Sequence, residues 1–502
     1  MTNQRFVLGI DAGQTNVKAV LHDQQLRPVA VARRSSPVTT SQPRYAERSQ
    51  DELWAATADA IAEVIKSSGV SPKDIVGVGL AGHGDGLHLV KKSGQAASMA
   101  ITAMDSRAYR YAEEILADPA RRNIILEKSG QLPAASSPGA LLKWMSVHDP
   151  EAVENADYMM SCKDVIRLRL TGEIATDISD ACSSFLDTNS AQWSSEIMQA
   201  YGVAGLERLL PELRLGGDIA GHITAAAAQR TGLAQGTPVV IGVHDVQAAS
   251  IGMSALTPGR LALVAGSFST NGVTTREKHV DSRWQSRLSV TPDLRIAMST
   301  SPTASPAVEW TLRLLGVASA QERDALFHET AQLSPEAHVP LTLPFHFASP
   351  LGAHASAAVA GIRGWHDRRH MFRGTLEGVV LMHVWHTQAL AEKFRWESDV
   401  VLGGGLSNSP LYTQLVANAL RTPISVIGNE EAGSFGAAAL AGVSVGLTAS
   451  LEQAQRLVER EHPVEPTAAS AGYWEDVIGQ FNELTQEISP WWLNHHGGIQ
   501  EP

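Results

Sequence analysis

Two apolar runs in this chain each end in an aspartate beside glycine, and this pattern constrains the fold more than any other feature. Residues 6–10 lead into Asp11 and the polar turn 12–16, and residues 238–243 lead through a histidine into Asp245. Short apolar runs bounded by glycine are typical of buried strands. Each carboxylate is therefore expected at the edge of a sheet, where open α/β folds bind ligands. Phosphoryl transfer from a nucleotide needs a metal ligand and a proton acceptor, and two such aspartates suit these roles.

Strand-like runs alternate with amphipathic helical stretches along the chain, which predicts an α/β architecture. Residues 6–22 have the pattern of a strand, a glycine turn and a second strand, and residues 52–68 carry apolar side chains at helical spacing. Residues 261–275 repeat the strand–turn–strand pattern. The repeat predicts two related domains, 1–250 and 251–502.

The amino-acid composition limits the classes of function that the protein can have. Of 502 residues, 44% are hydrophobic and 18% are charged, and the formal net charge is −12. Such a composition is that of a soluble globular protein, and the length suits two domains. No basic patch stands out, so neither nucleic acid nor a membrane surface is expected as a partner.

The number of cysteines and the N-terminal residues indicate the cellular compartment. Cys162 and Cys182 are the only cysteines, too few for a disulfide scaffold, and they suit a reducing compartment. No signal-peptide pattern is visible, and no apolar run approaches the roughly 20 residues that a membrane helix needs. We therefore expect a cytoplasmic protein. The sequence does not determine the oligomeric state, and a homodimer is kept as a hypothesis.

The first hairpin has the residues of a phosphate loop. Such a loop needs exposed backbone N–H groups, hydroxyl or amide donors and a cation, which Gly13, Thr15, Asn16 and Lys18 supply. Asp11, at the strand end, would hold Mg²⁺, which prefers oxygen ligands. The alternative is an ordinary β-turn with solvated polar residues.

Three further polar positions follow strands and are candidates for sugar binding. His83 and Asp85 alternate with glycines after the strand 75–80 and could hydrogen-bond a polyol, and Asp105 follows another apolar run. For Asp105 a local ion pair with Arg107 is the alternative. Asp245 could accept the proton of a substrate hydroxyl, or it could cap the helix that follows.

Several common site types are disfavoured. The chain has no Gly-x-x-x-x-Gly-Lys-Ser/Thr loop and no Gly-x-Ser-x-Gly elbow, which argues against a P-loop ATPase and a serine hydrolase. The pairs His366/His370 and His383/His386 have helical spacing but lack a clear third ligand, so we do not expect a transition-metal site there.

Taken in order, these segments resemble the FGGY carbohydrate kinases, which belong to the actin-like, Hsp70 and hexokinase ATPase superfamily. The resemblance runs from about residue 6 to residue 445. The segments that carry it are 11–18, 176–179, 242–245, 266–267, 357–377, 403–408 and 431–438.

The resemblance implies an ATP- and Mg²⁺-dependent kinase with two RNase-H-like domains, of the actin and hexokinase type, around a central cleft. The first domain would bind the sugar and the second the nucleotide. Asp245 would be the general base, contacting the substrate with His83, Asp85 and Asp105, and Asp11 would bind the metal. The implied nucleotide contacts are Gly13, Gln14, Thr15, Asn16, Lys18, Gly266, Ser267, Gly404, Gly405 and Asn408.

Departures from the family pattern bear on the substrate. Gln14 stands where a threonine is usual, and Ala103 replaces the tryptophan that precedes the aspartate in glycerol and xylulose kinases. Together with the turn at His83 and Asp85, these changes resemble the L-xylulose (3-keto-L-gulonate) kinase branch. We therefore expect a ketopentose or related sugar, phosphorylated at a terminal hydroxyl. The alternatives are a glycerol- or erythritol-type polyol kinase and a non-catalytic sugar-binding protein of the same fold.

Overall fold

The computed structural model forms two compact units, neither of which is a single stretch of chain. The structure describes residues 4–347, 349–352, 354–397, 400–428 and 431–496. The first unit comprises residues 1–258, 274–297 and 431–458, and the second comprises residues 259–273, 298–430 and 459–502.

The first unit is built on a seven-stranded sheet. Its order is β13-β14-β5-β1-β2-β3, with β15 also paired to β5. The hairpin predicted over residues 6–22 is confirmed as antiparallel β1 and β2, whereas β1 runs parallel to β5. The strands are β1 (Phe6–Ala12), β2 (Asn16–His22), β3 (Pro28–Ser35), β5 (Ile75–Gly82), β13 (Ile219–His222), β14 (Pro238–Val240) and β15 (Val243–His244).

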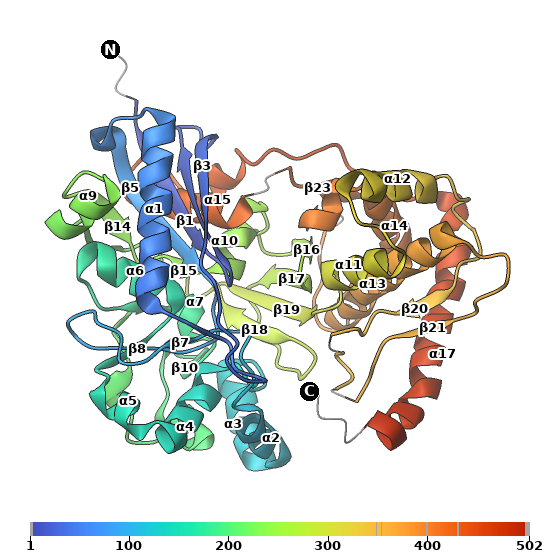
Figure 1. Ribbon diagram of the computed structural model, residues 1–502, viewed down its shortest axis with the longest axis horizontal. Helices are drawn as coiled ribbons and strands as arrows, with labels where there is room; N and C mark the ends of the chain where they lie inside the picture. The colour runs from blue at the N-terminus through green and yellow to red at the C-terminus, as the bar shows by residue number, and fades with distance from the viewer. Residues whose placement is uncertain (1–3, 348, 353, 398–399, 429–430, 497–502) are drawn as a thin grey trace. The chain divides into compact units, whose positions relative to one another are not determined.

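Helices cover both faces of this sheet (Figure 1). On one face, Leu8 and Ile10 of β1 form a core with Leu53 and Ile61 of α1 (Gln50–Ser68), the helix predicted over 52–68. Because side chains alternate along a strand, Gly9 faces the opposite side. A Cβ atom at Gly9 would lie 2.0 Å from a backbone oxygen of α15 (Ala432–Ser444), so the glycine lets α15 approach the strand directly.

Helix α10 (Asp245–Gly252) begins directly after β15 and packs closely against α15. The remaining helices of the first unit are α2 (Tyr109–Ala117), α3 (Pro119–Ser129), α4 (Pro138–His148), α5 (Pro150–Asn155), α6 (Cys162–Thr171), α7 (Ile178–Ala181), α8 (Ser195–Tyr201), α9 (Ala225–Thr231) and α16 (Leu451–Gln455). Its short strands are β4 (Glu47–Arg48), β6 (His88–Val90), β7 (Ala100–Ile101), β8 (Tyr158–Met160), β9 (Thr176–Asp177), β10 (Leu186–Asp187), β11 (Gln192–Trp193) and β12 (Leu213–Arg214).

A second large sheet has the order β18-β19-β17-β16-β22-β23. The strand–turn–strand pattern predicted over 261–275 is confirmed as antiparallel β16 and β17, and β16 runs parallel to β22. The strands are β16 (Leu261–Ala265), β17 (Ser269–Thr275), β18 (Gln285–Leu288), β19 (Arg295–Ser301), β22 (Val400–Gly403) and β23 (Ile424–Val426).

The second unit contains long helices and a small hairpin. These are α11 (Ser305–Leu314), α12 (Ala320–Ala331), α13 (Arg368–Ala391), α14 (Pro410–Leu420) and α17 (Ala471–His496), with β20 (Leu341–Leu343) and β21 (Ala358–Ala360). Trp474 and Trp492 of α17 are buried, and α17 contacts α14 and β20. Among the described residues, no helix has both the length and the apolar character needed to cross a membrane.

Candidate active site

The strands β1, β5 and β15 of the first unit end side by side, and a predicted site residue lies at the end of each. Asp11 of β1 pairs in register with residue 81 of the parallel strand β5, and Val243 of β15 pairs with the same residue. Asp11 therefore lies at the same sheet edge as His83, which follows β5, and Asp245, which follows β15. The structure thus places Asp11 and Asp245, the two aspartates singled out from the sequence, at one edge of the sheet.

Asp11 is surrounded by negative charge. Burial, Asp245 and Glu431 together raise the pKa of Asp11 to about 7, although Lys18 lowers it. A Cβ atom at Gly433 would lie 2.4 Å from Asp11 Oδ2, so the start of α15 approaches this carboxylate closely. A divalent cation that prefers oxygen ligands would offset this repulsion and keep Asp11 ionised, so the donor set is compatible with such an ion.

Lys18 is paired with a residue far away in the sequence. It lies opposite Asp11 on β2, and Arg33 lies opposite Lys18 on β3. Glu431 bridges the two cations, with Lys18 Nζ 3.1 Å from its Oε2 and Arg33 in contact with its Oε1. The predicted phosphate cation is therefore neutralised in this structure by an acid that precedes α15.

The turn between β1 and β2 has the form expected of a phosphate loop. The Gly13 N–H donates to the Asn16 carbonyl at 2.9 Å, and Thr15 and Asn16 are exposed. Gln14 Oε1 is buried and has no hydrogen-bond partner among the described residues. Beneath the turn, Arg48 Nη1 donates to the carbonyls of Gly13 and Gln14 at 3.3 and 3.1 Å.

His83 is buried beside the same arginine. Arg48 Nη2 lies 2.8 Å from His83 Nε2 and 3.3 Å from Cys162 Sγ. In the described part of the chain, His83, His88 and Cys162 are grouped closely enough to ligate a metal. Burial, however, raises the pKa of the Cys162 thiol to about 11, and the guanidinium that contacts two of the three groups would repel a cation. We therefore interpret this group as structural.

Asp85 lies in a strained turn that packs against His244. Its φ is 54°, a left-handed conformation that is uncommon outside glycine. A Cβ atom at Gly84 would lie 2.0 Å from the His244 ring, so only glycine lets this turn pack against His244. Asp85 Oδ1 has no hydrogen-bond partner among the described residues and lies 3.5 Å from Arg287 Nη2. Asp85 and His244 are thus both in contact with Arg287.

Asp105 forms an ion pair with Arg107, as one of the two sequence-based interpretations predicted. It accepts hydrogen bonds from the Ala46 N–H at 2.7 Å and from Arg107 Nη2 at 2.7 Å, and its side chain is fully buried. Arg107 also contacts Glu47 at 2.8 Å. Its role as a sugar contact stays a prediction.

Asp245 is the first residue of α10, and His244 takes the N-cap position. His244 Nδ1 lies 3.0 Å from Asp245 Oδ1, and the side chain of Asp245 is 39% exposed. Burial alone would raise the pKa of Asp245, but His244 lowers it below its ordinary value. The carboxylate is therefore ionised at neutral pH and accessible, as a proton acceptor must be.

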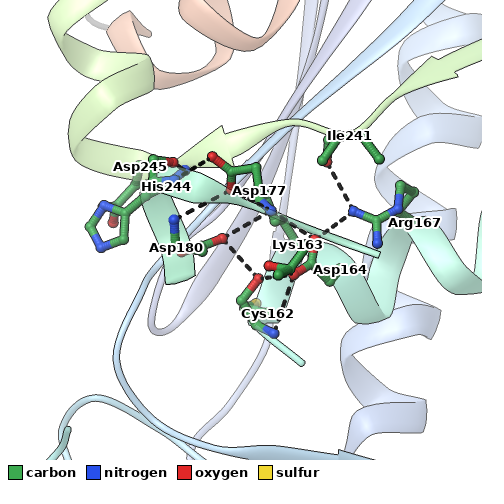
Figure 2. Close-up of polar contacts among 12 residues, drawn as sticks. Cys162, Lys163, Asp164, Arg167, Asp177, Asp180, Ile241, His244 and Asp245 are labelled. Atoms are coloured by element: carbon green, nitrogen blue, oxygen red, sulfur yellow. Dashed lines mark hydrogen bonds and ion pairs between the residues drawn. The ribbon is translucent and has the colours of Figure 1, made fainter. Parts of the chain in front are cut away.

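A buried ionic network lies next to His244 (Figure 2). Lys163 is fully buried and contacts Asp164 at 2.7 Å and both Asp177 and Asp180 at 3.0 Å. Asp177 accepts a hydrogen bond from the Ser179 N–H at 2.8 Å, and Ser179 Oγ accepts one from the His244 N–H at 2.9 Å. The network therefore fixes the backbone that carries Asp245, and segment 176–179 belongs to this support.

The residues predicted to bind the nucleotide in the second unit follow two neighbouring strands, at one edge of the sheet. Val264 of β16 pairs in parallel with Gly403 of β22, so the turn at Gly266 and Ser267 and the turn at Gly404 and Gly405 follow neighbouring parallel strands. A Cβ atom at Gly404 would lie 2.6 Å from the Ala265 carbonyl oxygen, and its φ is 93°. Ser267, Gly404, Gly405 and Asn408 are all exposed.

Comparison with known proteins identifies the class to which this fold and site belong. Residues 6–252 match the N-terminal domain and residues 261–445 the C-terminal domain of the FGGY family of carbohydrate kinases. The chain belongs to this family and is a carbohydrate kinase. Its two-domain α/β fold matches that of a solved Plasmodium falciparum glycerol kinase, with a TM-score of 0.85.

Among individual proteins, the chain is 30% identical to an L-xylulose/3-keto-L-gulonate kinase of Escherichia coli, with 92% of each chain covered. It is 28% identical to a probable L-xylulose kinase of Pasteurella multocida, over 96% of this chain and 99% of that protein. A xylulose kinase structure from Rhodospirillum rubrum has a TM-score of 0.87 and 23% identity, with 97% of this chain and 100% of that chain covered.

Sequence reasoning missed the cations and acids that surround the predicted residues. These residues are all buried, yet none of them follows a strand into a glycine turn: Arg48, Lys163, Arg287 and Glu431. The partners themselves come from distant segments and have no local signature.

Proposed function

We propose that this protein transfers the γ-phosphoryl group of ATP to a terminal hydroxyl of a ketopentose similar to L-xylulose. The observation that carries the proposal is the ionised, accessible carboxylate of Asp245 at the sheet edge shared with Asp11. The similarity to kinases named for L-xylulose supports the choice of sugar.

In the proposed reaction, the sugar oxygen forms a bond to the γ-phosphorus as the bond to the β,γ-bridging oxygen breaks and ADP leaves. Asp245 accepts the hydroxyl proton, and its low pKa keeps it ready to do so at neutral pH. His83 and Asp85 would orient the sugar from the neighbouring turn, and Asp105 would act from within its ion pair with Arg107.

Asp11 is the proposed Mg²⁺ ligand, and Mg²⁺ would neutralise charge on the phosphates when bound. The Gly13–Asn16 turn and Lys18 would contact the phosphates, with Gln14 offering an amide where a hydroxyl is usual. In the second unit, Gly266 and Ser267 would contact the phosphates and Gly404, Gly405 and Asn408 the adenosine.

A substrate panel in a coupled ADP-release assay tests the choice of sugar. We expect the highest kcat/KM for a ketopentose among pentuloses, hexuloses, pentitols, keto-acids, glycerol and erythritol, because Ala103 leaves no aromatic wall for a short polyol. The highest kcat/KM for glycerol or erythritol would favour a polyol kinase. Sugar binding without any ADP release would favour a non-catalytic binding protein.

Assembly, compartment and domain division are part of the same proposal. A homodimer stays a prediction, which light scattering of the purified protein would check. The two cysteines are buried free thiols, which supports placement in the cytoplasm. The division at residue 250 into a sugar-binding and a nucleotide-binding domain stays a prediction.

A further inference from the structure

We propose that Arg287 is a positioning residue that fixes the proton of His244 on Nδ1, so that this nitrogen donates a hydrogen bond to Asp245 Oδ1. The inference rests on the proposed role of Asp245 as the general base. It assigns a function to a buried arginine that the proposed chemistry does not otherwise use.

Arg287 lies on β18 with its side chain only 6% exposed. Its Nε donates to Gln131 Oε1 at 2.8 Å, and its Nη1 lies 3.1 Å from His244 Nε2. Its Nη2 lies 3.5 Å from Asp85 Oδ1. The guanidinium is thus held in one orientation by Gln131 and directs one donor at the histidine ring.

A guanidinium can only donate hydrogen bonds, so the atom it contacts must accept. His244 Nε2 therefore carries no proton, and a neutral ring with a bare Nε2 has its proton on Nδ1. Burial and Arg287 lower the pKa of His244 and favour the neutral ring, whereas Asp245 and Asp180 raise it, and the net effect is a pKa above the ordinary value. The close guanidinium contact favours the neutral ring, because a protonated Nε2 would point at another donor.

The tautomer decides between two competing partners of Nδ1. Nδ1 lies 3.2 Å from the Val246 N–H, from which it could accept, and 3.0 Å from Asp245 Oδ1, to which it could donate. A protonated Nδ1 can only donate, so Arg287 reinforces the bond to Asp245, which the ionised carboxylate also favours. The Val246 N–H is left for the Asp245 carboxylate, to which it also hydrogen-bonds.

The ring itself has little freedom to rotate. Its backbone N–H is bound to Ser179 Oγ, and Gly84 packs against the ring with no room for a side chain between them. With Oδ1 of Asp245 held by Nδ1–H, the other carboxylate oxygen is left to accept the substrate proton. Arg287 would thus act on the base through His244.

The direct test is the ¹⁵N spectrum of histidine-labelled protein, with the His244 signals assigned by their loss in His244→Phe. We expect the wild-type protein to show Nδ1–H and a bare Nε2 at His244. In Arg287→Met the population with the proton on Nε2 should rise, because no donor then faces Nε2 and Nδ1 can accept from the Val246 N–H, although the Asp245 carboxylate still favours Nδ1–H. Arg283 provides the control, because it is exposed and lies in the same segment, 274–297, as Arg287. Arg283→Met should leave the spectrum unchanged.

Kinetics provide a second readout that a merely structural role would not give. Arg287→Met should lower kcat by about 10-fold or more, the scale for losing a hydrogen bond to a charged group, with little change in the KM for ATP. In the His244→Phe background, Arg287→Met should change kcat by less than about 2-fold, because coupled residues are not additive.

A wild-type His244 with its proton on Nε2 would overturn the inference, even if Arg287→Met failed to fold. A full additional loss of kcat in the His244→Phe background would also overturn it. The spectrum does not depend on turnover, so it separates this inference from the proposed function. Absence of kinase activity with the Nδ1–H tautomer present would refute the proposed function and leave the assignment of Arg287 intact.

Discussion

Asp11 has a pKa of about 7, which makes the stability of the metal-free protein depend on pH. Because the folded protein binds this proton more tightly than the unfolded chain, the contribution of Asp11 to stability falls as pH rises from about 4 to about 7. We expect Asp11→Asn to raise the melting temperature relative to wild type at pH 8, and to do so much less at pH 5.

Thermal unfolding at the two pH values, with and without Mg²⁺, checks this prediction. Mg²⁺ should stabilise the wild-type protein at pH 8 and have a smaller effect on Asp11→Asn, because a ligand stabilises only the state that binds it. The exposed control Asp324→Asn should show the wild-type pattern. An equal response of Asp11→Asn and wild type to Mg²⁺ would reject Asp11 as a metal ligand.

At the level of single residues, the sequence predicted those that follow strands and missed those that support them. Asp11, His83 and Asp245 each follow an apolar run, and parallel pairing then brings them to one edge. Glu431 reaches Arg33 across 398 positions of sequence, and no local pattern predicts such a pair. The sequence also did not separate the two interpretations of Asp105, because only the structure shows that its carboxylate is enclosed by Arg107.

Among the elements, α15 depends on glycines for its close approach to its neighbours. A Cβ atom at Gly436 would lie 2.0 Å from the Ala248 carbonyl oxygen of α10, which a backbone shift must relieve. We expect Gly436→Ala to reduce the free energy of unfolding by about 1–3 kcal/mol, the usual cost of overpacking. Urea unfolding would measure it.

The same helix offers a matched control. A Cβ atom at Gly442 would make only ordinary contacts, the nearest at 3.5 Å from Thr448 Oγ1. Gly442→Ala should therefore be neutral or stabilise the protein by up to about 1 kcal/mol, since alanine favours the helix. Equal destabilisation by both substitutions would show that close backbone approach is not what limits α15.

Elements with strong periodicity were predictable, and their placement was not. The hairpins 6–22 and 261–275 and the helix 52–68 follow from alternation and helical spacing, and all three are confirmed. The small residues of 431–438 indicated close helix packing, but not that the partners would be β1, β5 and α10. Pairing between distant segments depends on tertiary contacts that periodicity does not encode.

At the scale of the whole molecule, the chain crosses between its units more than once. Segments 274–297 and 431–458 belong to the first unit although they follow the first residues of the second. Arg287 and Glu431, which contact His244 and Lys18, come from these returning segments. A repeat in the sequence indicates two related halves, but it cannot show which segments return.

The central claim is that Asp245 accepts the proton of a sugar hydroxyl, and sugar-dependent ADP release by Asp245→Asn tests it most directly. With the best sugar of the panel, we expect kcat to fall by at least about 100-fold while calorimetry shows little change in ATP binding, as for loss of a general base. Asp324→Asn should keep wild-type turnover. Near-normal turnover by a correctly folded Asp245→Asn protein would contradict the account.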